Sequence, residues 1–221
     1  MQIYLLLTTI IISVVAFPHE ELARHRIHVK GKPFNLQNGW PEYHSYCTLA
    51  YALLNHDNLH TWFEFGVAAG VSINITAALL PKCQIIGFDS FEGLPTTWRG
   101  HYAKGAFTQH GVIPPVRANV RLIKGLFQDT LPLVLPQTGV IDGINIDCDL
   151  YEPSLLILNA TFPHWRKGTL LHFHEFHDHH HHASEERRAL ESFVQHHPTA
   201  CLKQWDIPPC GLDGPAVFTV C

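Results

Sequence analysis

The chain has 221 residues, of which 46% are hydrophobic and 15% charged, with a formal net charge of -4. This composition excludes an intrinsically disordered protein, and the length fits one domain with an ordinary core. The small negative charge gives no electrostatic reason to expect a nucleic-acid partner. Histidine is unusually frequent, with 18 residues, so mild acidification moves the net charge toward positive values.

Residues 1–17 form an apolar segment that carries no charged side chain. Val14-Val15-Ala16 offers a small-residue cleavage site, but the basic region that usually opens a signal peptide is missing. The segment is also at the lower edge of the roughly 20 residues that span a bilayer. A cleaved signal peptide and an uncleaved membrane anchor both stay open, so we expect a secreted or membrane-anchored protein. Residues 18–60 are predicted to be a helical lead-in, and residues 61–221 the main domain.

Short apolar runs recur from residue 61 onward, with helical or irregular stretches between them. They cover residues 61–66, 84–89, 120–125, 142–149 and 169–176. Buried parallel strands have this continuous apolar character because helices cover both faces of their sheet. Residues 201–206 and 216–221 add two strand-like segments with a turn-rich link and no helix between them. The pattern predicts a doubly wound α/β domain whose sheet ends in a hairpin.

The first apolar run ends in the sequence FEFGVAAGVS, in which Gly66 and Gly70 are set four residues apart. Glycines at a strand-to-helix turn let the backbone approach a ligand, and the helix that follows near Val71 presents free N–H groups. The pattern differs from the dinucleotide fingerprint G-x-G-x-x-G because position 68 is not glycine. A structural turn for close helix–strand packing therefore remains an alternative to a cofactor cradle.

Acidic residues mark the ends of two further strands. Asp89 ends the second apolar run about twenty residues after the glycine turn, where an acid can bind a ribose diol; a solvated loop acid is the alternative. Asp147 and Asp149 end the fourth run and are two apart, so both face one site if the chain stays extended. Two adjacent carboxylates need a cation or a proton between them, and magnesium prefers such oxygen ligands. Helix capping by Asp149 is the alternative.

The fifth run delivers His174 and Glu175 to the neighbouring strand end, so four candidate metal ligands meet there: Asp147, Asp149, His174 and Glu175. His174 is also a candidate general base, because a neutral imidazole near pH 7 accepts a proton. A buried histidine that bonds to the backbone is the alternative interpretation.

Four motifs together resemble a known family: EFGVAAGVS, GFDSFEGLPTTW, KGLFQDTLP and IDCDLYEPS. In this order and spacing they are similar to the class I S-adenosylmethionine-dependent methyltransferases of the macrocin and mycinamicin O-methyltransferase type. The resemblance covers about residues 62–221. It implies a Rossmann-like seven-stranded sheet with an antiparallel last strand, which agrees with the hairpin expected at the tail. It also implies methyl transfer to a hydroxyl of a small molecule, such as a sugar or polyol, with help from magnesium.

The resemblance assigns cofactor contacts to residues at the ends of the first three strands. Those around the methionine and ribose parts are Glu64, Gly66, Gly70, Ser72 and Asp89, and those beside the adenine are Phe127, Gln128 and Asp129. It assigns Asp147 and Asp149 to the metal and to catalysis.

The chain departs from the family pattern at the fifth strand, where relatives carry Asp and this chain carries His174. Imidazole suits zinc, nickel, iron or copper better than magnesium. Three outcomes stay open. Glu175 ligates magnesium beside Asp147 without His174, His174 recruits a softer metal, or the site holds metal poorly and is catalytically weak.

The run His177-Asp178-His179-His180-His181-His182 follows the fifth strand directly. It is either a solvated loop or a second metal-binding tract. The alternative function is therefore a non-catalytic, histidine-rich protein on a methyltransferase fold that binds metal or another ligand. At the tail, antiparallel pairing would make Cys201 and Cys221 neighbours, bonded in an oxidising compartment and free thiols in the cytosol. The oligomeric state does not follow from the sequence.

Overall fold

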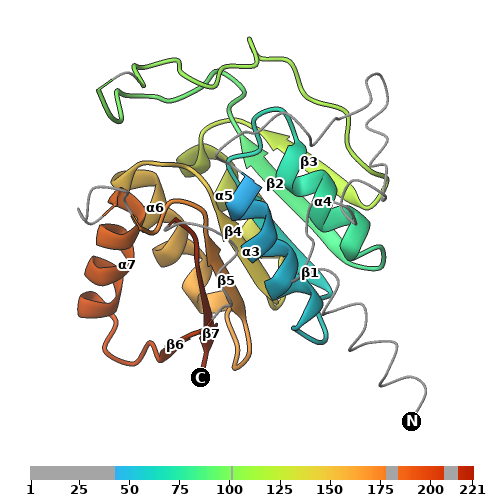
Figure 1. The fold of residues 1–221 in the computed structure, drawn as a ribbon, viewed down its shortest axis with the longest axis vertical. Coiled ribbons are helices and arrows are strands. Elements are labelled where there is room, and N and C mark those ends of the chain that lie inside the picture. The colour runs from blue at the N-terminus through green and yellow to red at the C-terminus, as the bar shows by residue number, and fades with distance from the viewer. Residues whose placement is uncertain (1–42, 101, 178–183, 207–213) are drawn as a thin grey trace.

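The computed structural model describes residues 43–100, 102–177, 184–206 and 214–221. Its centre is a seven-stranded sheet with the strand order β3-β2-β1-β4-β5-β7-β6 (Figure 1). The strands are β1 (Thr61–Phe65), β2 (Gln84–Asp89), β3 (Val120–Lys124), β4 (Gly143–Ile146), β5 (Leu170–Phe173), β6 (Leu202–Gln204) and β7 (Ala216–Val220). The first five are parallel, and β7 pairs antiparallel with both β5 and β6. The predicted fold class and the antiparallel last strand are confirmed.

The described residues between β2 and β3 form a loop, whereas helices precede β1 and follow β1, β3, β4 and β5. They are α3 (Tyr43–Leu54), α4 (Val71–Leu79), α5 (Phe127–Val134), α6 (Tyr151–Thr161) and α7 (Glu185–His196), with short 3-10 turns η1 (Leu135–Gln137) and η2 (Phe162–His164). α6 begins at Tyr151 after Leu150 as its N-cap, and no side chain caps it. Asp149 therefore does not cap this helix, which removes the structural alternative considered for that acid.

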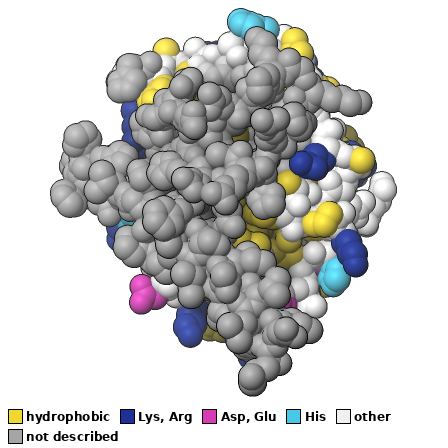
Figure 2. Space-filling view, turned by 45° about the vertical axis from the view of Figure 1, so that its right-hand side comes forward, with side chains coloured by type: hydrophobic (Ala, Val, Ile, Leu, Met, Phe, Trp, Pro, Cys, Tyr) yellow, Lys and Arg dark blue, Asp and Glu magenta, His cyan; other side chains and the backbone are white. Residues whose placement is uncertain are grey.

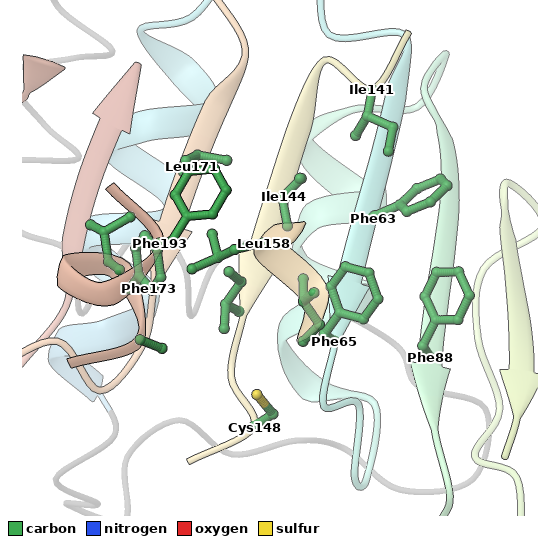
Figure 3. Packing of buried hydrophobic residues seen from close by; sticks show 14 of the residues in the cluster. Phe63, Phe65, Phe88, Ile141, Ile144, Cys148, Leu158, Leu171, Phe173 and Phe193 are labelled. Atoms are coloured by element: carbon green, nitrogen blue, oxygen red, sulfur yellow. The ribbon is translucent and has the colours of Figure 1, made fainter. Parts of the chain in front are cut away.

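The alternation of side chains along the strands divides the core into two layers. Phe63, Phe65 and Phe88 belong to the layer under α5, α6 and α7, and Figure 3 shows them beside one another on β1 and β2. Trp62 and Ile85 lie one residue out of step and pack in the other layer with buried residues of α3 and α4. β1 and β2 thus place apolar side chains on both faces, which explains why they read as continuous apolar runs, whereas β3 carries the exposed Arg121 and Lys124.

The C-terminal hairpin brings Cys201 and Cys221 together, and the two form a disulfide with a Cα–Cα distance of 5.3 Å. Their predicted proximity is confirmed. The free thiols of Cys83 and Cys148 are buried.

No helix in the described part of the chain is long and apolar enough to cross a membrane. The apolar segment 1–17 and residues 18–42 of the predicted lead-in lie outside the described residues, so the domain boundaries and the localisation stay predictions. Figure 2 shows Lys and Arg side chains as separate spots on the described part of one face.

The buried carboxylate of Asp142 links three chain segments at the amino ends of β1, β4 and β5. Asp142 accepts hydrogen bonds from the backbone N–H groups of His60 (2.9 Å) and Thr61 (3.0 Å), and from Arg166, whose Nη2 lies 2.6 Å away. Burial alone would raise the pKa of Asp142, but Arg166 and the two N–H groups outweigh it and hold the pKa below its ordinary value.

Asp142→Asn is expected to lower the free energy of unfolding by about 1.5–3 kcal/mol at pH 7, because charged hydrogen bonds are lost. A depressed folded-state pKa gives stability that is present above the unfolded value, about 3.9, and lost as the pH falls through the folded value. The difference in the free energy of unfolding between the wild-type protein and the Asp142→Asn variant should therefore become smaller in acid. Urea denaturation from pH 7 to pH 3 measures it, with the exposed Asp57→Asn as control. A gap that is constant with pH would contradict this account.

Gly66 directly follows β1 and lies against the main chain of Asp147, which directly follows β4. Its φ of +88° is a left-handed conformation, and a Cβ there would overlap the main-chain carbonyl oxygen of Asp147. Only glycine fits this position, because any side chain meets backbone rather than a movable group.

Gly66→Ala is expected to lower the free energy of unfolding by at least about 2 kcal/mol, from overpacking and the unfavourable φ together. Gly139→Ala serves as the control, since a Cβ at Gly139 meets nothing within 4 Å. Chemical denaturation of both variants measures the difference. Equal stability of the two variants would show that the close approach at Gly66 is not a constraint.

Candidate active site

The sheet register continues one residue past several strands and aligns the site residues. The N–H of Asp147 donates to the carbonyl of Phe65 (2.9 Å), and the N–H of His174 donates to the carbonyl of Ile146 (2.9 Å). Within the strands, Phe65 pairs with Ile146 and Ile146 with Phe173. The next level therefore contains Gly66, Asp147 and His174 side by side at the carboxyl edge of the sheet, where ligands bind in open α/β folds.

The glycine turn is held by the acid predicted to bind ribose. Oδ2 of Asp89 accepts hydrogen bonds from the N–H groups of Val67 and Ala68, both at 2.8 Å, and Oδ1 accepts one from Phe91 (2.7 Å). Gly70 caps α4 with a φ of +80°. The carboxylate of Asp89 thus fixes the path of the turn between β1 and α4, a structural part that the sequence did not indicate. Its contact with a ribose stays a prediction.

Glu64 is fully buried on β1, directly before the glycine turn. Ser72 on α4 donates to its Oε1 (2.6 Å), whereas Oε2 has no hydrogen-bond partner among the described residues. Burial raises the pKa of Glu64 to about 8, the Ser72 hydrogen bond opposes the rise, and the charge of Asp147 adds to it. A buried acceptor without a donor is well suited to a cationic or hydrogen-bonding ligand group.

His174 pairs with two carboxylates at the end of β5. Its Nδ1 lies 3.1 Å from Oδ1 of Asp147 and 3.6 Å from Oε1 of Glu175, and 12% of its side chain is exposed. Neither ring nitrogen makes a hydrogen bond of ordinary geometry within the described residues. Burial would lower the pKa of His174, but the negative charges of Asp147 and Glu175 outweigh it and raise the pKa to about 10. The imidazole therefore pairs electrostatically with Asp147 through Nδ1, and Nε2 makes no hydrogen bond within the described residues.

Asp149 has a left-handed backbone with a φ of +65°. Burial, followed by the charges of Asp147 and Glu175, raises its pKa to about 8. The extended chain that would make Asp147 and Asp149 face one site does not persist, because β4 ends at Ile146 and Asp149 is left-handed. Ala68 after β1 and Phe91 after β2 also have positive φ, of 44° and 59°. Non-glycine residues rarely adopt such conformations, and here they cluster at the ends of adjacent strands.

Glu186 is a site-bordering residue that the sequence interpretation missed. It is 0% exposed in the first turn of α7, and its Oε1 accepts hydrogen bonds from the N–H groups of Cys148 (3.2 Å) and Asp149 (3.3 Å). Its Oε2 accepts one from the N–H of Glu175 (3.0 Å). The available signal was its place on the apolar stripe of α7, three and seven residues before the buried Ala189 and Phe193.

The residues predicted to hold adenine begin α5 at the end of β3. Phe127 packs edge-on against Phe65 with ring centroids 5.4 Å apart, while Gln128 and Asp129 are exposed. They share the carboxyl edge of the sheet with the glycine turn. Their contact with adenine stays a prediction.

A long loop between β2 and β3 runs across the molecule at this edge (Figure 1). The guanidinium of Arg99 lies 4.1 Å from the ring centroid of Trp98, and its Nη2 is 3.4 Å from Oε2 of Glu175. Trp98 stacks on Tyr102, which contacts Phe107. The loop therefore presents an aromatic series beside the acidic strand ends.

The arrangement of the four predicted metal ligands does not fit a bound ion as it stands. The part of the chain that the structure describes contains no group of three or more His, Cys, Asp or Glu side chains that could hold one. Nδ1 of His174 faces Asp147, and Glu175 faces Arg99. Of the histidine run, residues 178–183 lie outside the described residues, so the second metal-binding tract stays a prediction.

Several solved structures share this fold over nearly the whole chain. CalS11, a TDP-rhamnose 3'-O-methyltransferase of calicheamicin biosynthesis, is 24% identical, with a TM-score of 0.55 over 96% of this chain and 92% of that one. The O-methyltransferase NovP is 17% identical, with a TM-score of 0.59 over 98% of both chains. An O-methyltransferase from Bacillus cereus in complex with SAH is 14% identical, with a TM-score of 0.53 over 95% and 94%.

A comparison with curated proteins gave no match. The model of a methyltransferase-domain family matches residues 63–176, which is more than half of the chain and spans β1 to the end of β5. This match agrees with the glycine turn and the acidic strand ends described above, and it confirms both the predicted resemblance to class I methyltransferases and the predicted enzyme class. The chain belongs to the methyltransferase-domain family.

Proposed function

We propose that this protein transfers the methyl group of S-adenosylmethionine to a hydroxyl of a small molecule. The observation that carries the proposal is the pairing of His174 with Asp147, 3.1 Å apart, on the same level of the sheet as Gly66. It brings a proton acceptor to the edge at which the glycine turn opens. CalS11 and NovP are O-methyltransferases, which supports an oxygen acceptor, and CalS11 is a TDP-rhamnose 3'-O-methyltransferase, which supports a sugar nucleotide.

The residues around the glycine turn fit the proposed cofactor. When bound, S-adenosylmethionine supplies an electrophilic methyl on a sulfonium. Oε2 of Glu64 is buried and makes no hydrogen bond of ordinary geometry within the described residues, so it can accept from an ammonium group of the ligand. Burial raises the pKa of this carboxyl to about 8, and a bound cation would lower it and favour the ionised form. Gly66 lets the start of the turn lie against the main-chain carbonyl of Asp147, and Ser72 orients Glu64 through its 2.6 Å hydrogen bond.

His174 is the group that we assign to the proton. As the acceptor oxygen forms its bond to the methyl carbon and the carbon–sulfur bond breaks, the hydroxyl proton passes to Nε2 of the imidazole in its neutral form. Because Asp147 and Glu175 raise the pKa of His174 to about 10, this neutral form is the minor one at pH 7, and the rate should rise with pH up to that value. Asp147, beside Nδ1, stabilises the imidazolium that results. Because the side chain is only 12% exposed, water competes little for this nitrogen.

We place the acceptor under the loop between β2 and β3. Trp98, Tyr102 and Phe107 form an aromatic series there, and Arg99 connects the loop to Glu175 at the end of β5. Aromatic faces provide large contact areas for the C–H surfaces of a sugar or polyol ring. The identity of the acceptor is left to the assay.

A divalent metal remains a prediction from the sequence, and none of the steps above depends on it. To bind Oδ1 of Asp147, an ion would compete with the imidazole of His174, which lies 3.1 Å from that oxygen. The imidazole also contributes nitrogen rather than the oxygen that magnesium prefers. The histidine at position 174, where the family pattern has Asp, therefore disfavours magnesium at this site.

His174→Ala is expected to lower kcat by about 10²–10⁴-fold, the usual contribution of a general base, with cofactor affinity changed little. Added imidazole should restore part of the activity. Formation of S-adenosylhomocysteine is measured with a panel of hydroxylated acceptors that begins with TDP-rhamnose, and cofactor affinity by calorimetry. His196→Ala, at an exposed position of α7, is the control. An unchanged kcat in the His174 variant would rule out its role as base.

His174→Asp is expected to raise the affinity for magnesium at least tenfold or so, because it replaces a nitrogen donor with a carboxylate and frees Asp147. Magnesium is titrated by calorimetry into proteins whose residues 179–182 are changed to serine, so that the histidine run does not contribute. His196→Asp controls for the added charge. Equal affinity of the His174→Asp and parent proteins would show that the imidazole does not stand in the way of the metal.

A further inference from the structure

We propose that Glu186 is a positioning residue whose single carboxylate, anchored in α7, holds the ends of β4 and β5 so that Asp147 and His174 stay paired. The proposal rests on the methyl transfer proposed above and extends it to a residue outside the strands.

The contacts of Glu186 join the two strand ends that carry the proposed chemistry. Oε1 accepts from the N–H groups of Cys148 and Asp149, at 3.2 and 3.3 Å, directly after Asp147. Oε2 accepts from the N–H of Glu175, at 3.0 Å, directly after His174. β4 and β5 have already ended at these points, so the carboxylate takes the place of ladder hydrogen bonds between them.

The need to cap α7 does not explain why a buried glutamate stands at position 186. Ser184 already caps α7 by accepting from the N–H of Arg187 (3.1 Å). The neighbouring Glu185 also reaches across, but its Oε2 accepts only from the N–H of Tyr151 (3.1 Å), away from the pair. Glu186 is instead 0% exposed among acids, where an ordinary first-turn glutamate would face water.

The three donors require two acceptor oxygens within the reach of a glutamate side chain. Burial and the charge of Asp147 raise the pKa of Glu186, and both oxygens of a carboxyl group can accept hydrogen bonds whether or not it carries a proton. In Glu186→Gln the amide NH₂ faces at least one backbone N–H, so one contact becomes a clash of donors. Glu186→Asp keeps the charge but is one methylene shorter, so it cannot reach all three donors from α7. The two variants thus separate geometry from charge.

The effect should pass through His174, which a double-mutant cycle detects. Glu186→Gln and Glu186→Asp are each expected to lower kcat at least about tenfold, as a small misplacement of reacting groups does, while cofactor affinity stays within about twofold. In a His174→Ala background the same substitutions should change kcat by less than about twofold, because the group that they misplace is absent. Glu185→Gln is the matched control in the same helical turn and should leave kcat unchanged.

Hydrogen exchange gives a readout that needs no turnover. Peptides that contain residues 147–149 and 174–176 should exchange faster in Glu186→Gln than in the Glu185→Gln protein, whereas peptides from β1 and β2 should not change. Equal, multiplicative losses of kcat with and without His174, or a Glu186→Asp variant with wild-type kcat, would overturn the positioning role. Unchanged exchange at both strand ends would overturn the clamp itself. If the wild-type protein methylates no acceptor, the proposed function and this role both fail, even where the exchange shows the clamp.

Discussion

The hydrogen-bond register of β1, β4 and β5 is the constraint on which the site depends. Because the ladder continues from Phe65 to the N–H of Asp147 and from Ile146 to the N–H of His174, the chain has no freedom to move these residues along their strands independently. A slip of one residue would turn every side chain to the opposite layer of the core and bury apolar groups on the wrong side. The packing of the two apolar layers thus fixes which residues stand side by side at the carboxyl edge of the sheet.

Charge is concentrated at that edge in an unusual balance. Asp147, Glu175 and the buried Glu186 converge from β4, β5 and α7, and the described cations that contact these acids are His174 and Arg99. Adjacent carboxylates repel one another unless cations or protons compensate them. In this chain the imidazole of His174 and the guanidinium of Arg99 compensate part of the negative charge, and the raised pKa values of Asp149 and Glu186 favour the protonated forms of these two acids.

The sequence predicted the sheet well because buried parallel strands leave a direct signature of apolar runs. It also predicted the proximity of Asp147 and His174, since the carboxyl ends of neighbouring parallel strands meet at one edge. It could not predict contacts that depend on three-dimensional reach. Glu186 looks like any acid that begins a helix, and nothing in the motif around Asp89 shows that its carboxylate accepts three backbone N–H groups. The left-handed turn at Asp149 was hidden for the same reason, because a non-glycine residue gives no sign of a positive φ.

Three left-handed backbone conformations beside the site lower the stability of the fold. Ala68, Phe91 and Asp149 each hold a positive φ just beyond a strand, and for residues with a Cβ this costs about 1–2 kcal/mol apiece. Glycine at Ala68 or Phe91 would remove that strain, although Phe91 would also lose its buried ring. An engineer who seeks heat resistance would therefore find the simplest gain at Ala68, in the very turn whose shape Asp89 maintains. A glycine at Ala68 would therefore raise stability and at the same time loosen the turn after β1. Selection for heat resistance and selection for a rigid turn would favour different residues at this position.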